Sequence, residues 1–254
     1  MIILLILILL VIVILLQKIL RKSKTITTHG DQSSKMHIII CSTPNNTIRI
    51  EHMKKFIHEN QLSNDYNFTW DHGLFVSKNS SEVSAITNNR QDHDFNDFNI
   101  ELYVAHCLTY IKVLEWFLDG KYENILILED DIIVVQDDIN VVMHIESAPY
   151  FDVLVLEWCY GKCQNMTHEN SDKRWAYNLD AHCTAAIVWT KVAAREFLRF
   201  VEKRKRLFNI DELTSQFFST KAVTVVYSNP PIIMQDRKTF TDGVSENNGL
   251  DLCF

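Results

Sequence analysis

The chain has 254 residues, enough for one sizeable domain or two small ones, and 47% of them are hydrophobic. Its net charge is −7, and the first 24 residues hold four of the 25 basic residues but none of the 32 acidic ones. The remainder is therefore strongly acidic. This argues against a nucleic-acid-binding surface or a domain lying flat on anionic lipid, and favours a solvated acidic surface.

The N-terminal segment predicts a single membrane-spanning helix. Residues 1–16 contain no polar side chain, and basic residues follow directly behind them. Counting to Leu20 gives about the 20 apolar residues that a spanning helix needs. A signal peptide would carry positive charge before its apolar run and a small-residue cleavage site after it, and neither is present. A buried helix is the other alternative. We predict a transmembrane signal anchor over residues 1–22.

The orientation of this anchor stays open. All nearby positive charge lies on its C-terminal side, so the positive-inside rule leaves the rest of the chain in the cytosol. An enzyme facing the lumen of an endoplasmic reticulum, Golgi-type or other internal membrane would go against that bias. Four glycosylation sequons support the lumenal side weakly; they begin at Asn45, Asn67, Asn79 and Asn165.

The first elements of the folded region read as strand and then helix. Residues 23–35 are polar and Ser/Thr-rich and predict a stem, so the domain itself spans 36–254. Residues 35–43 predict a short buried strand. Residues 47–61 predict a helix with one apolar face, formed by Ile50, Met53, Phe56 and Ile57.

The same alternation continues along the chain. Residues 77–98 are polar and loop-like, residues 99–122 predict an amphipathic helix that stops at Gly120, and 124–128 predict a strand. Further on we expect a strand over 150–159, a helix over 191–206, and a strand over 221–236 that is broken by Pro230–Pro231. Alternating strands and helices indicate an α/β domain with a mainly parallel central sheet.

Three adjacent carboxylates interrupt an apolar run in "NILILEDDIIVV", residues 124–135. Glu129, Asp130 and Asp131 stand at the C-terminal end of the predicted strand, the edge where open α/β sheets bind ligands. Burying them unpaired would be costly. A bound Mg²⁺ or Mn²⁺ would supply the missing positive charge. Alternatively, the strand ends one residue early and the acids face water. No glycine-rich phosphate loop and no G-x-S-x-G elbow is present.

The cysteines allow two further interpretations. Cys159 and Cys163, with His168 and the pair His182–Cys183, could form a zinc site, although the spacing is nonstandard. A disulfide between Cys159 and Cys163 would require an oxidising compartment.

An ordered set of motifs between residues 36 and 245 resembles glycosyltransferase family 25, the lipopolysaccharide-biosynthesis and procollagen-galactosyltransferase family. The set comprises the opening strand and helix with Arg49, the helix leading into the Leu-Glu-Asp-Asp strand, "FDVLVLEWC", "AHCTAAIVWTKVAAREFL", "FNIDELTSQFF" and "PPIIMQD". Two features depart from the family pattern. Its Ser-His is Thr109–Tyr110 here, and its usual Tyr is Ala185 or Ala186, so the donor or acceptor contacts differ.

The resemblance implies a GT-A fold, a UDP-sugar donor and Mn²⁺ (or Mg²⁺), with hexose transfer that is largely inverting in the family. It places Asp131 and Glu129 at the metal, and Glu129, Asp130, Arg49 and Thr43 at the nucleotide-sugar. Strand alternation would send Glu129 and Asp131 to one side and Asp130 to the other.

For the catalytic base we favour Asp211, with Glu212 and Glu157 behind it. Asp211 could instead cap the helix that follows it. The roles of several other residues stay open. Trp158 and Trp189 could stack on a sugar or belong to the core. His182 could be a metal ligand or a structural histidine, and Gln235–Asp236 could close the acceptor site or simply end a strand.

Three functions compete. The first is a membrane-anchored, metal-dependent glycosyltransferase moving galactose or glucose to a hydroxyl on a glycan, protein or lipid-linked acceptor. The second is a nucleotidyltransferase, which would want a basic or glycine-rich triphosphate loop. The third is a non-catalytic glycan-binding or scaffold relative, although that function gives no reason to keep three clustered carboxylates.

Overall fold

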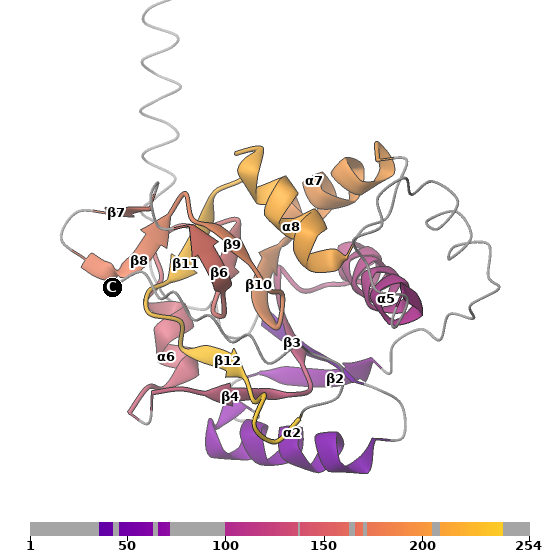
Figure 1. Ribbon diagram of the computed structural model, residues 1–254, viewed down its shortest axis with the longest axis vertical. Helices are drawn as coiled ribbons and strands as arrows, with labels where there is room; N and C mark the ends of the chain where they lie inside the picture. Colours follow the sequence, from indigo (N-terminus) through magenta and orange to yellow (C-terminus); the bar gives the residue numbers. More distant parts are fainter. Residues whose placement is uncertain are drawn as a thin grey trace, which may run out of the picture. The chain divides into compact units, whose positions relative to one another are not determined.

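The computed structural model describes residues 36–42, 46–62, 66–71, 100–136, 138–162, 166–169, 172–204 and 209–240 (Figure 1). These residues belong to one compact unit, Ser33–Phe254. The predicted anchor, the stem and the polar segment 77–98 lie outside them. Within the described part of the chain, no helix has the length and apolar character needed to cross a membrane.

A sheet of eight strands organises the domain, in the order β2-β1-β3-β10-β5-β11-β8-β7. Six of the eight run in one direction, and β10 and β8 run against them, so the sheet is mixed with mostly parallel strands. In chain order its strands are β1 (Met36–Cys41), β2 (Asn67–Asp71), β3 (Asn124–Glu129), β5 (Val153–Val155), β7 (Thr167–Glu169), β8 (Asp172–Tyr177), β10 (Ala186–Thr190) and β11 (Val225–Ser228).

Two small ribbons extend the structure beyond this sheet. β4 (Ile132–Val134) pairs with β12 (Ile233–Gln235), and β6 (Cys159–Lys162) pairs with β9 (Asp180–His182). The first ribbon follows directly on the acidic triplet and lies next to α2, where His52 Nε2 hydrogen-bonds to Ile132 O at 2.7 Å (Figure 1). It brings the C-terminal part of the described chain, including Gln235, next to the end of β3.

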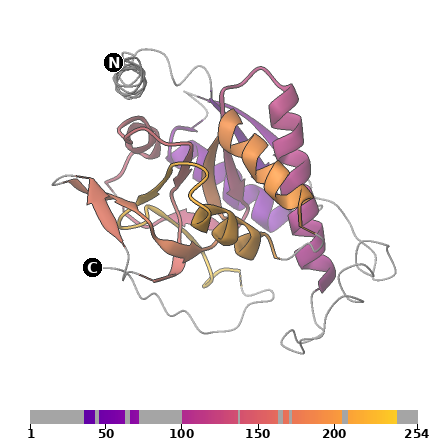
Figure 2. The same ribbon diagram turned by 90° about the horizontal axis from the view of Figure 1, so that it is seen from above.

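Helices cover both faces of the sheet. α5 (Ile100–Asp119), α7 (Lys191–Glu202) and α8 (Ile210–Ser219) pack on one face, where α5 and α7 lie side by side (Figure 2). α2 (Thr47–Glu59) and α6 (Val141–Glu146) pack on the other.

Two cores result from strand alternation. In β3, Ile125 and Ile127 belong to the core under α5, α7 and α8, whereas Leu126 and Leu128 belong to the core over α2 and α6. β1 alternates in the same way and is buried along its whole length. Such continuous apolar runs are expected of strands covered on both faces.

The helix boundaries follow capping chemistry. Asn46, Thr190 and Asn209 cap α2, α7 and α8, each accepting a hydrogen bond from a backbone N–H of the first turn. The predicted stop at Gly120 is confirmed, because its N–H closes the last turn of α5 on Trp116 and Phe117.

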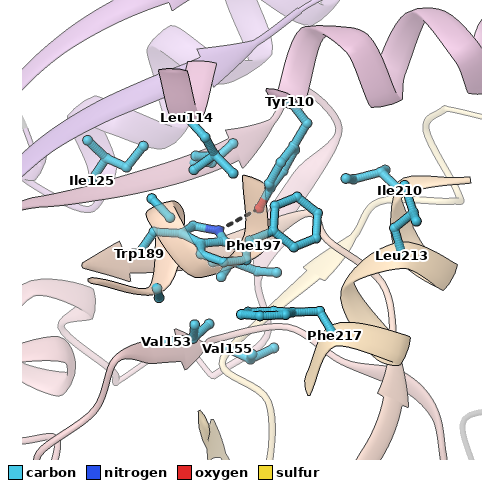
Figure 3. Packing of buried hydrophobic residues seen from close by; sticks show 14 of the residues in the cluster. Tyr110, Leu114, Ile125, Val153, Val155, Trp189, Phe197, Ile210, Leu213 and Phe217 are labelled. Carbon is cyan, nitrogen blue, oxygen red and sulfur yellow. Dashed lines mark hydrogen bonds between the residues drawn. The ribbon is translucent and has the colours of Figure 1, made fainter. Parts of the chain in front are cut away.

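Both tryptophans in question are core residues, so the sugar-stacking alternative is wrong for them. Trp189 is fully buried, and its Nε1 donates to Tyr110 Oη at 2.8 Å in the core packed against α5, α7 and α8 (Figure 3). Trp158 is equally buried and donates to Ser228 O at 2.7 Å. Tyr110, which stands where the resembling family has histidine, is therefore a packing residue.

The predicted strand 150–159 is shorter in the structure, because only Val153–Val155 pairs within the sheet. Asp152, just before it, accepts a hydrogen bond from Thr224 N on one carboxylate oxygen and from Tyr150 Oη on the other. These bonds fix Tyr150 and Asp152 outside the strand. The predicted strand over 221–236 does divide at the prolines, into β11 and β12.

Candidate active site

The acidic triplet lies at the topological switch point of the sheet. β1 leads through α2 to β2 on one side, while β3 lies on the other side of β1 and leads away toward β5. Glu129, the last residue of β3, pairs in register with Cys41, the last residue of β1. In open α/β sheets, ligands bind outside the carboxyl ends of the strands at such a point.

The predicted alternation of the three acids is only partly right. β3 ends at Glu129 and the chain turns at Asp130–Asp131 before β4. Glu129 faces α5 and α8, but Asp130 and Asp131 both contact Arg49 of α2, because the turn removes the strand period after Glu129. The strand does end early, yet the acids do not simply face water, since Asp130 is 4% exposed.

Arg49 neutralises the α2 side of the triplet. Its Nη1 contacts Asp130 Oδ1 closely and lies 3.3 Å from Asp131 Oδ2, and its guanidinium lies over the ring of Phe240. α2 begins at Thr47, so Arg49 stands in its first turn, held toward β3 by the cap at Asn46. One arginine therefore serves two carboxylates.

Asp131 is the least satisfied acid of the triplet. Its Oδ1 is buried and makes no hydrogen bond to any described residue. Burial, the charge of Glu129 and the charge of Asp130 raise the pKa of Asp131 to about 7, although Arg49 opposes them. A buried oxygen without a donor is costly, so this atom is suited to receive a cation or a proton.

Glu129 has the opposite character. His106 Nε2 of α5 lies 3.3 Å from its Oε1, and Gln235 Nε2 of β12 donates to its Oε2 at 2.8 Å. Burial raises the pKa of Glu129, but His106, Gln235 and Thr184 outweigh burial and lower it below the ordinary value. In turn, the charge of Glu129 overcomes burial and raises the pKa of His106 to about 9. The two form a charged pair at neutral pH.

Thr184 joins Glu129 to Asp211. Its Oγ1 lies 2.7 Å from Asp211 Oδ1 and 3.2 Å from Glu129 Oε1. Asp211 is not the cap of α8, because the Asn209 side chain fills that role, so the alternative of a capping aspartate is wrong. Burial and the charge of Glu129 raise the pKa of Asp211, while His106 and Thr184 partly oppose them.

Glu157 lies deeper, at the end of the segment that contains β5. It is 3% exposed, and its Oε2 accepts a hydrogen bond from the backbone N–H of Ala185 at 3.1 Å. Burial and the charges of Glu129 and Asp211 raise its pKa well above the ordinary value. Because Glu157 is buried and its Oε2 already accepts a backbone hydrogen bond, it is better suited to holding the 184–185 segment than to acting as base on a substrate.

The structure thus brings together most of the residues predicted for the site: Arg49, Glu129, Asp130, Asp131, Glu157 and Asp211. Glu212 does not join them through any described contact; it accepts a hydrogen bond from Gln216 one turn along α8. Thr43 lies outside the described residues. The charge of His182 lowers the pKa of Asp211, which places this histidine near the cluster.

Sequence reasoning missed His106 and Thr184, and left the role of Gln235 open. Each contacts Glu129 and each comes from a different part of the chain, so no local pattern connects them. A weak signal existed for His106, a charged side chain among the apolar residues of the 99–122 helix.

The site fits a metal that shares its ligands with a substrate. Among the residues that the structure describes, no three His, Cys, Asp or Glu side chains are arranged to hold an ion by themselves. Glu129 and Asp130 already face donors, and Asp131 Oδ1 is the buried oxygen left without one. Mg²⁺ and Mn²⁺ are commonly held by one or two carboxylates plus substrate phosphates, a requirement that Asp131 meets.

The cysteines do not support the zinc alternative. Cys183 is disulfide-bonded, so its sulfur is not a free thiolate. Cys41 and Cys107 are free and buried, and burial raises the pKa of both thiols. The disulfide considered between Cys159 and Cys163 lies outside the described side chains.

Comparisons with known proteins give low similarities. No family model matches the chain, and no curated protein matches it. Among solved structures, A197 from STIV is 18% identical with a TM-score of 0.35, over 76% of this chain and 81% of that one. A glycosyltransferase involved in the glycosylation of the major capsid of PBCV-1 is 16% identical with a TM-score of 0.33, over 66% and 67%.

A nucleoside-diphosphate-sugar pyrophosphorylase from Vibrio cholerae RC9 is 12% identical with a TM-score of 0.38, over 82% of this chain and 78% of that one. At these values the likenesses carry no argument about function. Membership of glycosyltransferase family 25 stays a prediction, and the function rests on the residues of this chain.

Proposed function

We propose that this protein is a metal-dependent glycosyltransferase that moves a hexose, galactose or glucose, from a UDP-sugar to a hydroxyl group of a glycan or protein acceptor, with inversion. One observation carries the proposal. At the switch point of the sheet, the half-buried Asp131, whose buried Oδ1 has no hydrogen-bond partner among the described residues, belongs to the same acidic cluster as the half-buried Asp211, whose pKa is raised. A GT-A fold is part of the proposal.

Asp131 would hold the Mn²⁺ or Mg²⁺. The bound ion would neutralise charge on the diphosphate leaving group. Glu129 was predicted as a second ligand, but both of its oxygens already face donors, so we assign it to positioning instead. Asp130 keeps Arg49 in place beside Asp131.

Asp211 would remove the proton of the acceptor hydroxyl at its carboxylate oxygen. A pKa above the usual aspartate range brings a base closer to the pH at which it works, and so improves proton transfer. Thr184 holds the Oδ1 atom of Asp211 at 2.7 Å. The charged pair Glu129–His106 holds Thr184 from the other side.

The single-pass anchor over residues 1–22 is also part of the proposal, with the catalytic domain on the lumenal side of an internal membrane. The disulfide at Cys183 supports this side, since disulfides persist in oxidising compartments. Asn67, which begins a sequon, is exposed at the start of β2. Glycosidase treatment of the protein expressed in a eukaryotic host should reduce its apparent mass, and Asn67→Gln should remove part of that change. An unglycosylated, protease-accessible domain in sealed microsomes would place it in the cytosol.

The function is tested with the full chain in detergent. It is incubated with Mn²⁺ and a panel of nucleotide-sugars, and the released nucleoside diphosphate is measured with and without EDTA. We expect release from one UDP-sugar, abolished by EDTA and by Asp211→Asn when acceptor is present. Pyrophosphate release from UTP and a sugar phosphate would instead identify a nucleotidyltransferase. If neither product release nor metal-dependent UDP binding is observed, the remaining hypothesis is the non-catalytic relative.

A further inference from the structure

Arg237 is a cation at the site that forms no ion pair with any carboxylate of the described residues. It follows β12, and its Nη2 donates to Gln235 Oε1 at 2.7 Å. Gln235 in turn donates to Glu129 Oε2 at 2.8 Å, which links the arginine to the acidic cluster. The Nη1 atom of Arg237 is buried and has no hydrogen-bond partner among the described residues. None of the described carboxylates forms an ion pair with it.

This arrangement is costly unless a ligand completes it. The guanidinium is always charged. A buried N–H of such a group loses its hydration, and without an acceptor no hydrogen bond compensates for that loss. The other arginine of the site cannot serve the same purpose, because Arg49 already contacts Asp130 and Asp131. Arg237 is therefore the available cation among the described arginines at this edge.

Two atoms of opposite charge that have no partner among the described residues belong to segments joined by a backbone hydrogen bond. The backbone N–H of Asp236, the residue before Arg237, donates to the backbone carbonyl of Asp131. Within the described part of the chain, Asp131 Oδ1 has no donor and Arg237 Nη1 has no acceptor. A diphosphate with its divalent cation satisfies both requirements, the cation at the carboxylate and a phosphate oxygen at the guanidinium.

We propose that Arg237 binds the diphosphate of the donor, and that Gln235 positions it by holding Nη2. The identity of the anion as a sugar-linked diphosphate rests on the proposed function; the anion site itself does not. Planar N–H groups of arginine match phosphate oxygens, and a fixed positive charge there stabilises the negative charge that develops as the sugar–phosphate bond breaks.

The test measures binding by calorimetry, with UDP and with inorganic pyrophosphate as probes, on the full chain in detergent with Mn²⁺. Arg237→Gln should weaken binding of both probes by about 10- to 100-fold, the usual loss for a charge-assisted contact. Arg199→Gln is the matched control, since Arg199 lies exposed on α7 and pairs with Glu196. It should leave both affinities unchanged. Arg237→Lys keeps the charge without the planar fork and should fall between wild type and Arg237→Gln.

The outcomes separate this inference from the proposed function. Affinities of Arg237→Gln within twofold of wild type would overturn the inference, as would a wild-type protein that binds neither probe. Should Arg237→Gln fail to fold, Arg237→Lys with wild-type affinities would overturn it as well. Binding that depends on Arg237, in a protein that turns over none of the nucleotide-sugars, would retain the anion site and reject the transferase.

Discussion

The two sides of the end of β3 differ in how completely their charges are partnered. On the side of α5 and α8, Glu129 is contacted by His106, Gln235 and Thr184. Thr184 also forms a hydrogen bond with Asp211. At Asp131, by contrast, no described residue donates a hydrogen bond to the buried Oδ1 atom. The side of Glu129, the first half of the site, has all its charges partnered by the protein itself and can hold a base in place. The side of Asp131, the second half of the site, needs a bound cation or ligand to complete it, and this need distinguishes a binding site from a structural ion pair.

Asp211→Asn should produce the largest effect on turnover. An amide cannot accept the acceptor proton, so we expect kcat to fall by about 10²- to 10⁴-fold while UDP affinity is kept. Glu212→Gln is the matched control, because that neighbour bonds only within α8 among the described contacts and should retain near wild-type kcat. Equal losses in the two variants would assign the effect to disturbance of α8 and remove Asp211 from the chemistry.

Asp131→Asn should act on the other half. The amide is a poorer ligand for Mn²⁺, so Mn²⁺-dependent UDP affinity should fall by about 10- to 100-fold. Asp138→Asn, a change at an exposed position beyond β4, serves as the control. If Asp131→Asn bound Mn²⁺–UDP as tightly as wild type, the incomplete half would have to be assigned to something other than a metal.

Thr184→Val tests whether the two halves work together. Removing the hydroxyl takes a hydrogen bond from ionised Asp211, and we expect kcat to fall by about 10-fold with KM little changed. Because the Thr184 hydroxyl lowers the pKa of Asp211, its loss should raise that pKa and move the acid side of the pH–rate profile to higher pH. Thr184→Ser should restore both. A serine variant as slow as the valine variant would make the methyl group, and so packing, responsible.

His106→Gln should have the smallest effect, on stability more than on turnover. The pKa of His106 is raised in the fold from 6.5 to about 9, so its contribution is fully present below pH 6.5 and lost as pH rises through 9. We expect a loss of about 2 kcal/mol at pH 6, near that of one hydrogen bond between charged groups. Thermal melts from pH 5.5 to 10 should show the difference from wild type closing above pH 9. A difference that does not change with pH would mean that His106 is not charged in the fold.

The sequence predicts the frame of this fold better than its site. The continuous apolar runs predict β1 and β3, and the helical spacing of apolar residues predicts α2. Local sequence patterns are therefore enough to predict these elements. The acidic triplet is equally visible, because carboxylates inside an apolar run need an explanation. β10 was missed as a strand, since its run "AIVWT" leads straight into α7 and no turn residue separates them.

The partners of the triplet were harder to foresee. His106 stands on α5, Gln235 on β12, and Thr184 in the loop between β9 and β10, and only the sheet order and the β4–β12 ribbon bring them to Glu129. The side to which Asp131 points also depends on where β3 ends, because moving the end of the strand by one residue changes the expected direction of the next side chains. Long-range assembly of this kind leaves no periodic signal in the chain.

Calorimetric titration of UDP into the full chain tests the central claim most directly, with Mn²⁺ present and again after EDTA, in the wild type and in Asp131→Asn. We expect one-to-one binding that requires the metal and that Asp131→Asn weakens to the level of the EDTA sample. UDP binding of equal strength in all of these samples would contradict it, since the unpartnered oxygen of Asp131 would then have no part in holding the donor.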